Sequence, residues 1–290
     1  MDFLDELESR IIPADGAMGT ELIAANIPAE TCFEELCVSQ PDLVCDIHDR
    51  YLAAGARLIE TNTFGANAVR LARHGLEHRV NEINWSAAQL AKQCVRGKNA
   101  YVAGSVGPLG IDAAQAGERG LDRAAIFREQ LGALLDGGVN LIIFETFTDL
   151  EELALALYVK QSLHHCPAVC SVVCDENGAL PSGISLADAF TKLRALDAEV
   201  VGVNCVESAT MTRVFNNVPD DGLRAAFANA GNPKSRDARL VHDTTPDDFA
   251  QSARSLANRG VRLIGGCCGT GPRHIAAMVA ALENVMPNGD

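Results

Sequence analysis

The 290-residue sequence has little positive charge: 24 Lys and Arg residues stand against 38 Asp and Glu residues, and the formal net charge is −14. Domains that bind nucleic acids or anionic membranes usually carry a basic patch, and no such patch with interleaved aromatic residues occurs here. No run of 18 apolar residues and no N-terminal secretory signal is found. We therefore expect neither nucleic acid nor a membrane as a partner.

Several cysteine and glycine motifs are also missing. None of the ten cysteines forms a Cys-x-x-Cys pair, which argues against zinc-ribbon, thioredoxin-like and ferredoxin-like sites. The Walker phosphate loop and the Gly-x-Gly-x-x-Gly fingerprint are absent too. Ten cysteines without a secretory signal are typical of a reducing compartment, so a cytoplasmic location is expected. Most of these thiols are expected to be packing residues, among them Cys45, Cys94, Cys170 and Cys174.

Short apolar, β-branched runs recur along the chain and alternate with segments of helical period. The runs cover residues 10–15, 57–61, 100–105, 141–145, 168–173, 200–204, 223–229 and 261–264. Helical periodicity marks 42–54, 80–94, 123–135, 150–163 and 249–258, and residues 1–7 resemble the start of an amphipathic helix. Eight strands alternating with helices predict parallel βαβ units. With no linker or shift in composition, we predict a single (β/α)8 TIM barrel over residues 1–290.

Polar and thiol residues follow these apolar runs, where a packed core would prefer Val or Leu. The carboxyl ends of barrel strands converge on one face, which is where such barrels hold their sites. The residues concerned are Asp15, Thr61, Asn62, Ser105, Glu145, Cys174, Cys205, Asn229, Cys267 and Cys268.

Three cysteines stand out within this set. Cys205 ends one strand, and the adjacent pair Cys267 and Cys268 follows another within Gly-Gly-Cys-Cys-Gly-Thr. Three thiolates are suitable soft ligands for a zinc ion that keeps one position open. Neighbouring residues of a strand point to opposite faces, so the pair can hold one ion only where the strand ends and the chain bends. A redox pair or plain packing is the alternative for these adjacent cysteines.

Six segments together resemble the zinc-dependent homocysteine S-methyltransferase family. They are Asp15-Gly16-Ala17-Met18-Gly19-Thr20, Glu60-Thr61-Asn62-Thr63-Phe64-Gly65, Gly104-Ser105-Val106-Gly107-Pro108, Phe144-Glu145-Thr146-Phe147, Gly202-Val203-Asn204-Cys205 and Gly265-Gly266-Cys267-Cys268-Gly269-Thr270. The resemblance spans residues 3–285 and includes the homocysteine-binding module of cobalamin-dependent methionine synthase. It implies a (β/α)8 barrel that moves a methyl group to the thiolate of L-homocysteine and gives L-methionine.

The resemblance also implies roles for individual residues. Cys205, Cys267 and Cys268 would be the zinc ligands. Glu145 would hold the amino group of homocysteine, and Asp15 with the backbone of Gly16 would fix the amino-acid end. For each of these two carboxylates the alternative is structural: an ion pair that stabilises the barrel for Glu145, and an ordinary turn for Asp15. Two asparagines, Asn62 and Asn204, are further candidates for substrate binding, although strand-end Asn residues often serve only the backbone.

The methyl donor is less clearly indicated. A cationic donor such as betaine favours an aromatic cage, but the chain has one Trp, Trp85, in a helical segment, and three Tyr. Phe33, Phe64, Phe147 and Asn229 are the candidates for the donor side. These features make betaine less favoured than S-methylmethionine, or than a methylfolate or methylcorrinoid supplied by a separate protein.

Two alternatives stay open at this point. One is a related enzyme that methylates another thiol or a selenol such as selenohomocysteine. The other is a non-autonomous zinc-binding module that presents homocysteine within a multi-protein methionine synthase. The segment 223–231 lacks the proline that the family often has before Asn, and the continuation Val206-Glu207-Ser208 after Cys205 is unusual. Both departures concern the donor side more than the zinc site.

Overall fold

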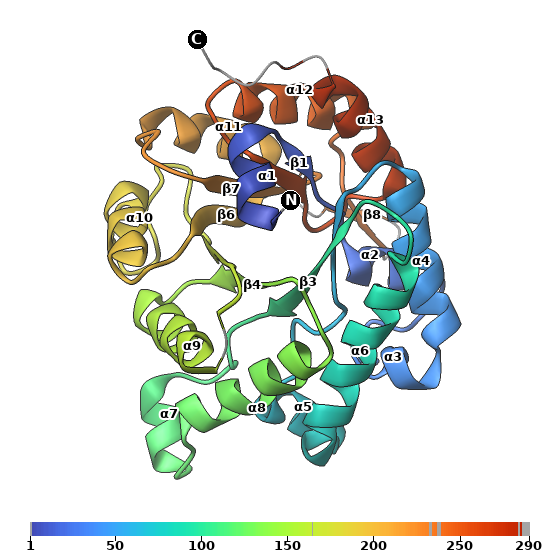
Figure 1. Ribbon diagram of the computed structural model, residues 1–290, viewed down its shortest axis with the longest axis vertical. Helices are drawn as coiled ribbons and strands as arrows, with labels where there is room; N and C mark the ends of the chain where they lie inside the picture. Colours follow the sequence, from blue (N-terminus) through green and yellow to red (C-terminus); the bar gives the residue numbers. More distant parts are fainter. Residues whose placement is uncertain (1, 164, 232–233, 237–238, 284, 286–290) are drawn as a thin grey trace.

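Eight parallel strands form the central sheet of the computed structural model, which describes residues 2–163, 165–231, 234–236, 239–283 and 285. Helices surround the strands on the outside (Figure 1). The strands are β1 (Ile12–Pro13), β2 (Leu58–Glu60), β3 (Tyr101–Val106), β4 (Leu141–Phe147), β5 (Ala168–Val172), β6 (Val200–Glu207), β7 (Arg224–Asn229) and β10 (Leu263–Gly266). Each lies within or overlaps one of the eight runs expected from the sequence.

The sheet closes on itself. Its strand order is β1-β10-β7-β6-β5-β4-β3-β2, and a parallel bridge between Ala14 and Leu58 joins the two outer strands. The amide of Arg57 also donates to the carbonyl of Pro13 at 2.7 Å. Closure leaves no free edge and brings all eight carboxyl ends to one face. The predicted TIM-barrel fold is therefore confirmed.

Helices follow the strands and cover the barrel with their apolar faces. The longer ones are α4 (Pro41–Ala53), α6 (Val80–Cys94), α8 (Arg123–Asp136), α9 (Leu150–Leu163), α10 (Leu186–Ala195), α12 (Pro246–Ala257) and α13 (Pro272–Leu282). The shorter ones are α2 (Met18–Ala24), α3 (Leu36–Ser39), α5 (Ala68–Leu71), α7 (Ala113–Glu118) and α11 (Ser208–Val214), with 3-10 turns at Ala72–His74, Glu77–Arg79 and Phe215–Asn217. The five predicted helices correspond to α4, α6, α8, α9 and α12. None of the helices described is long and apolar enough to cross a bilayer.

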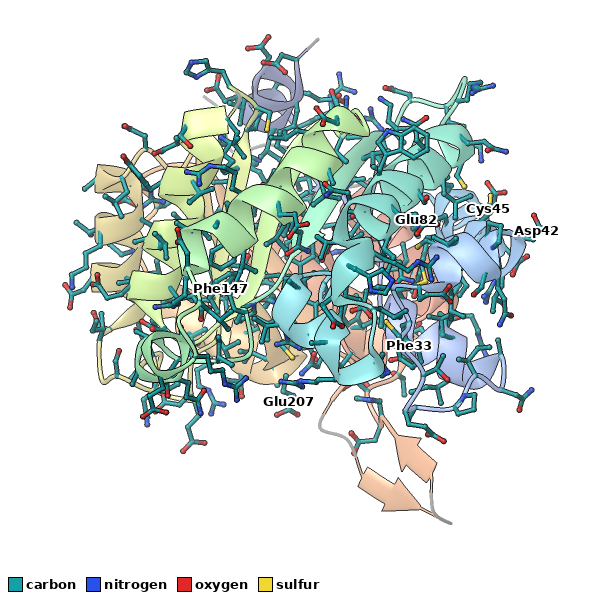
Figure 2. The ribbon with its side chains drawn as sticks, turned by 90° about the horizontal axis from the view of Figure 1, so that it is seen from below. Phe33, Asp42, Cys45, Glu82, Phe147 and Glu207 are labelled. Atoms are coloured by element: carbon teal, nitrogen blue, oxygen red, sulfur yellow. The ribbon has the colours of Figure 1, made fainter. Side chains whose placement is uncertain are left out.

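The short helix α1 (Phe3–Ser9) closes the end of the barrel opposite the carboxyl ends of the strands. Phe3 and Leu7 are buried among inward-facing strand residues such as Leu58 and Leu263. Figure 1 shows α1 lying across the middle of the strands, and Figure 2, turned by 90°, places it at the opposite end of the molecule from a small hairpin. That hairpin, β8 (Lys234–Arg236) and β9 (Arg239–Val241), was not expected from the sequence.

A buried carboxylate fastens α1 to the barrel. Glu6 accepts hydrogen bonds from Arg57 Nη1 at 2.7 Å and from the Tyr101 hydroxyl at 2.7 Å. Burial alone would raise the pKa of Glu6, but the hydrogen bonds and the charge of Arg57 outweigh it, and the net effect is a lowered pKa. The carboxylate is therefore more stable ionised in the folded chain than in the unfolded chain.

The lowered pKa of Glu6 predicts an acid-dependent loss of stability. Its contribution is fully present above the ordinary pKa of 4.5 and is lost as the pH falls through the lower folded value. Glu6→Gln should cost about 1.5–3 kcal/mol at pH 7, the range for hydrogen bonds to charged groups. Urea unfolding at pH 7 and pH 3 checks this, and a penalty that does not shrink at pH 3 would contradict it.

Candidate functional site

A cavity of about 340 Å³ opens at the carboxyl ends of the strands. Most of the residues singled out from the sequence meet there. The wall is formed by Asp15, Gly16, Ala17, Met18, Gly19, Thr20, Phe33, Glu34, Glu60, Thr61, Asn62, Thr63, Phe64, Ser105, Glu145, Thr146, Cys205, Phe227, Gly266, Cys267 and Cys268. Among the described residues that form this wall there is no Lys, Arg or His. The cavity is therefore rich in groups that can become anionic and has no cationic side chain to balance them.

Three thiols lie together on one side of the cavity. The sulfur atoms of Cys205, Cys267 and Cys268 are all within 4.8 Å of one another, and the Cys205 and Cys268 sulfurs are 3.9 Å apart. All three are free cysteines, and Cys268 is the most exposed. The sequence prediction that these residues from two strands come together is confirmed.

The adjacent cysteines share one site because β10 ends just before them, at Gly266. The Cys267 amide still donates to the Ala228 carbonyl at 2.8 Å, and the Ala230 amide donates to the Cys268 carbonyl at 2.9 Å. The chain then turns at Gly269, where φ is +80° and a Cβ would overlap the ring of His242. Only glycine fits this position without strain. The turn removes the strand alternation that would have separated the two sulfurs.

Cys205 reaches the same site through a break in the pairing of β6 with β7. The register shifts between Asn204 and Val206, and Cys205 itself has a φ of +58°. A non-glycine residue in this region costs about 1–3 kcal/mol and is typical of functional sites. A bulge of this kind re-aims a side chain at a barrel rim. Here it turns the Cys205 side chain toward the Cys267 and Cys268 pair.

The donor set and the spacing suit a zinc ion. Tetrahedral coordination with Zn–S bonds of about 2.3 Å requires sulfur atoms about 3.8 Å apart, close to the separation of the Cys205 and Cys268 sulfurs. Hydrogen bonds with Cys205 and Cys267 lower the pKa of Cys268, whereas hydrogen bonds with Cys205 and Cys268 raise the pKa of Cys267. The cluster therefore favours a thiolate at Cys268, the kind of ligand that a divalent zinc ion takes.

Three carboxyl groups, from the ends of three different strands, line the same cavity. Asp15 accepts a hydrogen bond from the Glu60 amide at 3.0 Å. Glu145 accepts one from the Ser105 hydroxyl at 2.5 Å and a longer one from the Asn204 amide at 3.5 Å. Asp15 is buried, whereas Glu60 and Glu145 are partly accessible. All three line the cavity, so their open side is the cavity itself.

These carboxyl groups are harder to ionise than ordinary ones. Burial is the largest cause, and it raises the pKa of Asp15, Glu60 and Glu145. The charge of Glu145 raises the pKa of Asp15 and of Glu60 further. The hydrogen bond from Ser105 opposes this effect at Glu145. A cationic ligand placed among them would favour the ionised forms.

The three asparagines expected near the site differ in position. Asn62 lines the cavity and donates to the Phe33 carbonyl at 2.6 Å. Asn204 does not line the cavity: its amide accepts from the Thr146 amide and donates to the Thr146 hydroxyl, both at 2.7 Å. It therefore fixes the chain next to Glu145, where Thr146 has a φ of +62°. Asn229 is buried beside Cys205, with its amide nitrogen 4.0 Å from that sulfur, and lies outside the cavity wall.

Of the aromatic residues expected at the mouth, Phe33 and Phe64 line the cavity, together with Phe227. Phe147 does not. It is fully buried and packs against Phe144, with ring centroids 6.2 Å apart. The register of β4 shifts between Phe144 and Phe147, so strand alternation no longer tells which way Phe147 points. The expectation that Phe147 faces the donor is therefore wrong. Figure 2 shows Phe147 well apart from Phe33.

Sequence reasoning assigned no role to Glu60, although its carboxyl group faces the cavity. The signal was present: Glu60 is a charged residue at the end of the apolar run 57–61. The predicted run continues to Thr61, whereas β2 ends at Glu60 itself.

Comparison with known proteins agrees with this geometry. The family model described as "Homocysteine S-methyltransferase" matches residues 13–282. Methionine synthase of Mycobacterium tuberculosis is 31% identical over 306 residues, covering 98% of this chain and 26% of that protein. Its counterpart in Mycobacterium leprae is 30% identical over 315 residues, covering 100% and 26%. The chain thus spans about a quarter of the length of these relatives.

A solved structure shares the whole barrel. The metallated form of the homocysteine methyltransferase MmuM from Escherichia coli superposes with a TM-score of 0.77 at 25% identity. The match covers 93% of this chain and 96% of that one. The family model covers most of the barrel, including every residue of the cavity wall. On these grounds the chain belongs to the homocysteine S-methyltransferase family.

Proposed function

We propose that this chain transfers a methyl group to the sulfur of L-homocysteine and so forms L-methionine, with zinc as its cofactor. One observation carries the proposal. Three thiols within 4.8 Å of one another share a cavity with three carboxyl groups, and no Lys, Arg or His lines its described wall. A substrate with a thiol at one end and an ammonium group at the other suits both sides of such a cavity. The family supports homocysteine as that substrate.

Different residues of the cavity would bind the zinc ion and the two ends of homocysteine. Cys205, Cys267 and Cys268 would hold the zinc ion. When bound, zinc offers an open position to a thiol and lowers its pKa, so that the nucleophilic thiolate is present at neutral pH. Glu145 and Asp15 would hold the ammonium group by charge. Gly16 would place its backbone against the amino-acid end, where a side chain would clash with Thr270, 2.8 Å from the Cβ position.

Holding both ends of homocysteine fixes the direction in which its sulfur faces the open side of the cavity. Orientation of this kind can contribute about 7–11 kcal/mol to lowering a barrier. Because the three ligands act as reduced thiols, we also propose a reducing compartment, the cytoplasm, as the location.

The donor side favours S-methylmethionine, methylfolate or methylcorrinoid over betaine. Among the described residues of the cavity wall, the aromatic ones are all Phe, which is a weaker partner for a quaternary ammonium than Trp. The guanidinium of Arg70 lies 5.0 Å from the centre of the Phe64 ring, so one face of that ring already contacts a cation. Trp85 lies in α6 and is 49% exposed.

A second candidate is a homocysteine-presenting module that works only with a partner protein carrying the methylated folate or corrinoid. The specific observation in its favour is the coverage of the methionine synthases, of which this chain matches only 26%. In this case the cavity would bind homocysteine as described, and the donor would enter with the partner.

A donor panel separates the two candidates and is the test of the proposed function. The zinc-loaded chain is incubated with homocysteine and, in separate reactions, S-methylmethionine, methyltetrahydrofolate, methylcobalamin or betaine, and methionine is quantified by mass spectrometry. We expect methionine from at least one of the first three and least from betaine. Homocysteine binding without turnover on any donor would favour the module. A zinc-loaded chain that neither binds nor methylates homocysteine would contradict both.

A further inference from the structure

The carboxyl side of the cavity contains one more acid than the two that were expected to bind the amino group. Asp15, Glu60 and Glu145 come from the ends of β1, β2 and β4, and all three line the same wall. No Lys, Arg or His among the described residues of that wall offsets them. Three buried or half-buried acids with no cationic partner are costly unless a ligand supplies the charge.

Geometry separates the role of Glu60 from that of Asp15. Asp15 is buried and already accepts a hydrogen bond from the Glu60 amide through Oδ2, at 3.0 Å. The Glu60 side chain lines the same wall as Glu145, whose charge raises the pKa of Glu60. Both of these glutamates keep part of their surface open to the cavity. Both glutamates are therefore open to a ligand in the cavity, whereas Asp15 is more deeply buried.

An α-ammonium group matches this arrangement. Like the Lys ammonium it has three N–H donors and no acceptor, so it can donate to three separate carboxyl groups at once. Hydrogen bonds between charged groups are shorter and about twice as strong as neutral ones. A thiol without an amino group would leave the acids uncompensated.

We propose that Glu60 is the third acceptor for the ammonium group of the thiol substrate and that it makes the site selective for amino thiols. The proposal rests on the proposed function, because it assumes that homocysteine occupies this cavity with its sulfur toward the cysteines. It adds a binding residue and a selection rule: the cavity discriminates against thiols of the same length that lack the amino group.

The test compares L-homocysteine with 4-sulfanylbutanoate, which has the same carbon chain, thiol and carboxylate but no amino group. Isothermal titration calorimetry on the zinc-loaded chain gives a dissociation constant for each thiol, and the ratio of the two constants measures the selectivity. Glu60→Gln keeps the shape and removes the charge. We expect it to lower the selectivity on the order of tenfold to a hundredfold, by weakening homocysteine binding alone. Glu60→Asp should restore part of it.

Glu34→Gln is the matched control. Glu34 also lines the cavity, but its carboxylate accepts from the Gly65 amide at 2.8 Å, on the loop side of the wall. Removing this charge should leave the ratio unchanged. An equal loss of selectivity in Glu34→Gln and Glu60→Gln would overturn the proposal, because the effect would then be a general one of cavity charge.

Two further outcomes are distinguishable. If the wild-type chain prefers homocysteine and Glu60→Gln keeps the full preference, Glu60 is not an ammonium ligand, although the proposed function stands. If the wild-type chain binds both thiols equally, the ammonium site as a whole is wrong, Glu60 included. If Glu60→Gln weakens the binding of both thiols by the same factor, the proposal is also overturned, because the effect would then indicate a structural role for Glu60.

Discussion

Replacing Cys268 or Cys267 by alanine is expected to abolish stoichiometric zinc binding and methyl transfer while the barrel stays folded. The remaining pair of sulfurs cannot complete a three-thiolate set. The turn itself should persist, because the Cys267 amide and the Cys268 carbonyl are held by the backbone at Ala228 and Ala230. Both side chains are at least partly accessible, so truncation removes little core packing. Turnover should fall by several orders of magnitude.

The measurement is zinc per chain by atomic emission after dialysis, with turnover and the thermal unfolding of the metal-free proteins recorded in parallel. Cys45→Ala is the control. Cys45 lies in α4, and its sulfur is 2.7 Å from that of Cys94, in the outer helix layer (Figure 2). This variant should keep one zinc and full turnover. If Cys268→Ala keeps one zinc per chain and its activity, the metal binds elsewhere and the proposed mechanism fails.

The barrel was predictable because its strands are buried on both faces. Parallel strands covered by helices appear in a sequence as continuous apolar runs, and each of the eight runs contains or overlaps an observed strand. The β8–β9 hairpin did not stand out, because its six strand residues, Lys234–Arg236 and Arg239–Val241, include three basic residues and no continuous apolar run. Its pairing is local and does not need the barrel core.

The proximity of the three cysteines could be predicted from the sequence, whereas the orientation of the Phe147 side chain could not. Cys205 and the Cys267 pair end two apolar runs, and barrel geometry alone places such ends on one face. Phe147 follows a bulge in β4 that involves Thr146, a non-glycine residue with positive φ. Nothing local in the sequence marks a Thr for that conformation, because the surrounding structure imposes it. The Asn204 side chain, 58 residues away, clamps Thr146 at 2.7 Å.

Glu145→Gln should weaken homocysteine binding and remove part of its pH dependence. Losing a charged hydrogen-bond partner for a buried ammonium costs about 2–5 kcal/mol. Burial raises the pKa of Glu145, so the carboxylate becomes protonated at a higher pH than an ordinary Glu. The wild-type chain should therefore lose affinity for homocysteine as the pH falls through this raised value and keep it above that value. In Glu145→Gln this loss of affinity at low pH should be smaller.

Deprotonation of the substrate thiol also depends on pH, so the comparison needs an internal reference. Homocysteine and 4-sulfanylbutanoate are each titrated by calorimetry at every pH. Thiol deprotonation affects the dissociation constants of both compounds alike, so the ratio of the two constants reports the contribution of the ammonium group. For the wild-type chain the ratio should approach one as the pH falls, because neutral carboxyl groups no longer attract the ammonium group. For Glu145→Gln the ratio at neutral pH should be smaller than in the wild type and should change less with pH, with Asp15 and Glu60 supplying the part that stays. Two outcomes would contradict this prediction: a wild-type ratio that does not change with pH, or a Glu145→Gln ratio equal to that of the wild type. Either one would show that Glu145 does not bind the ammonium group of the substrate.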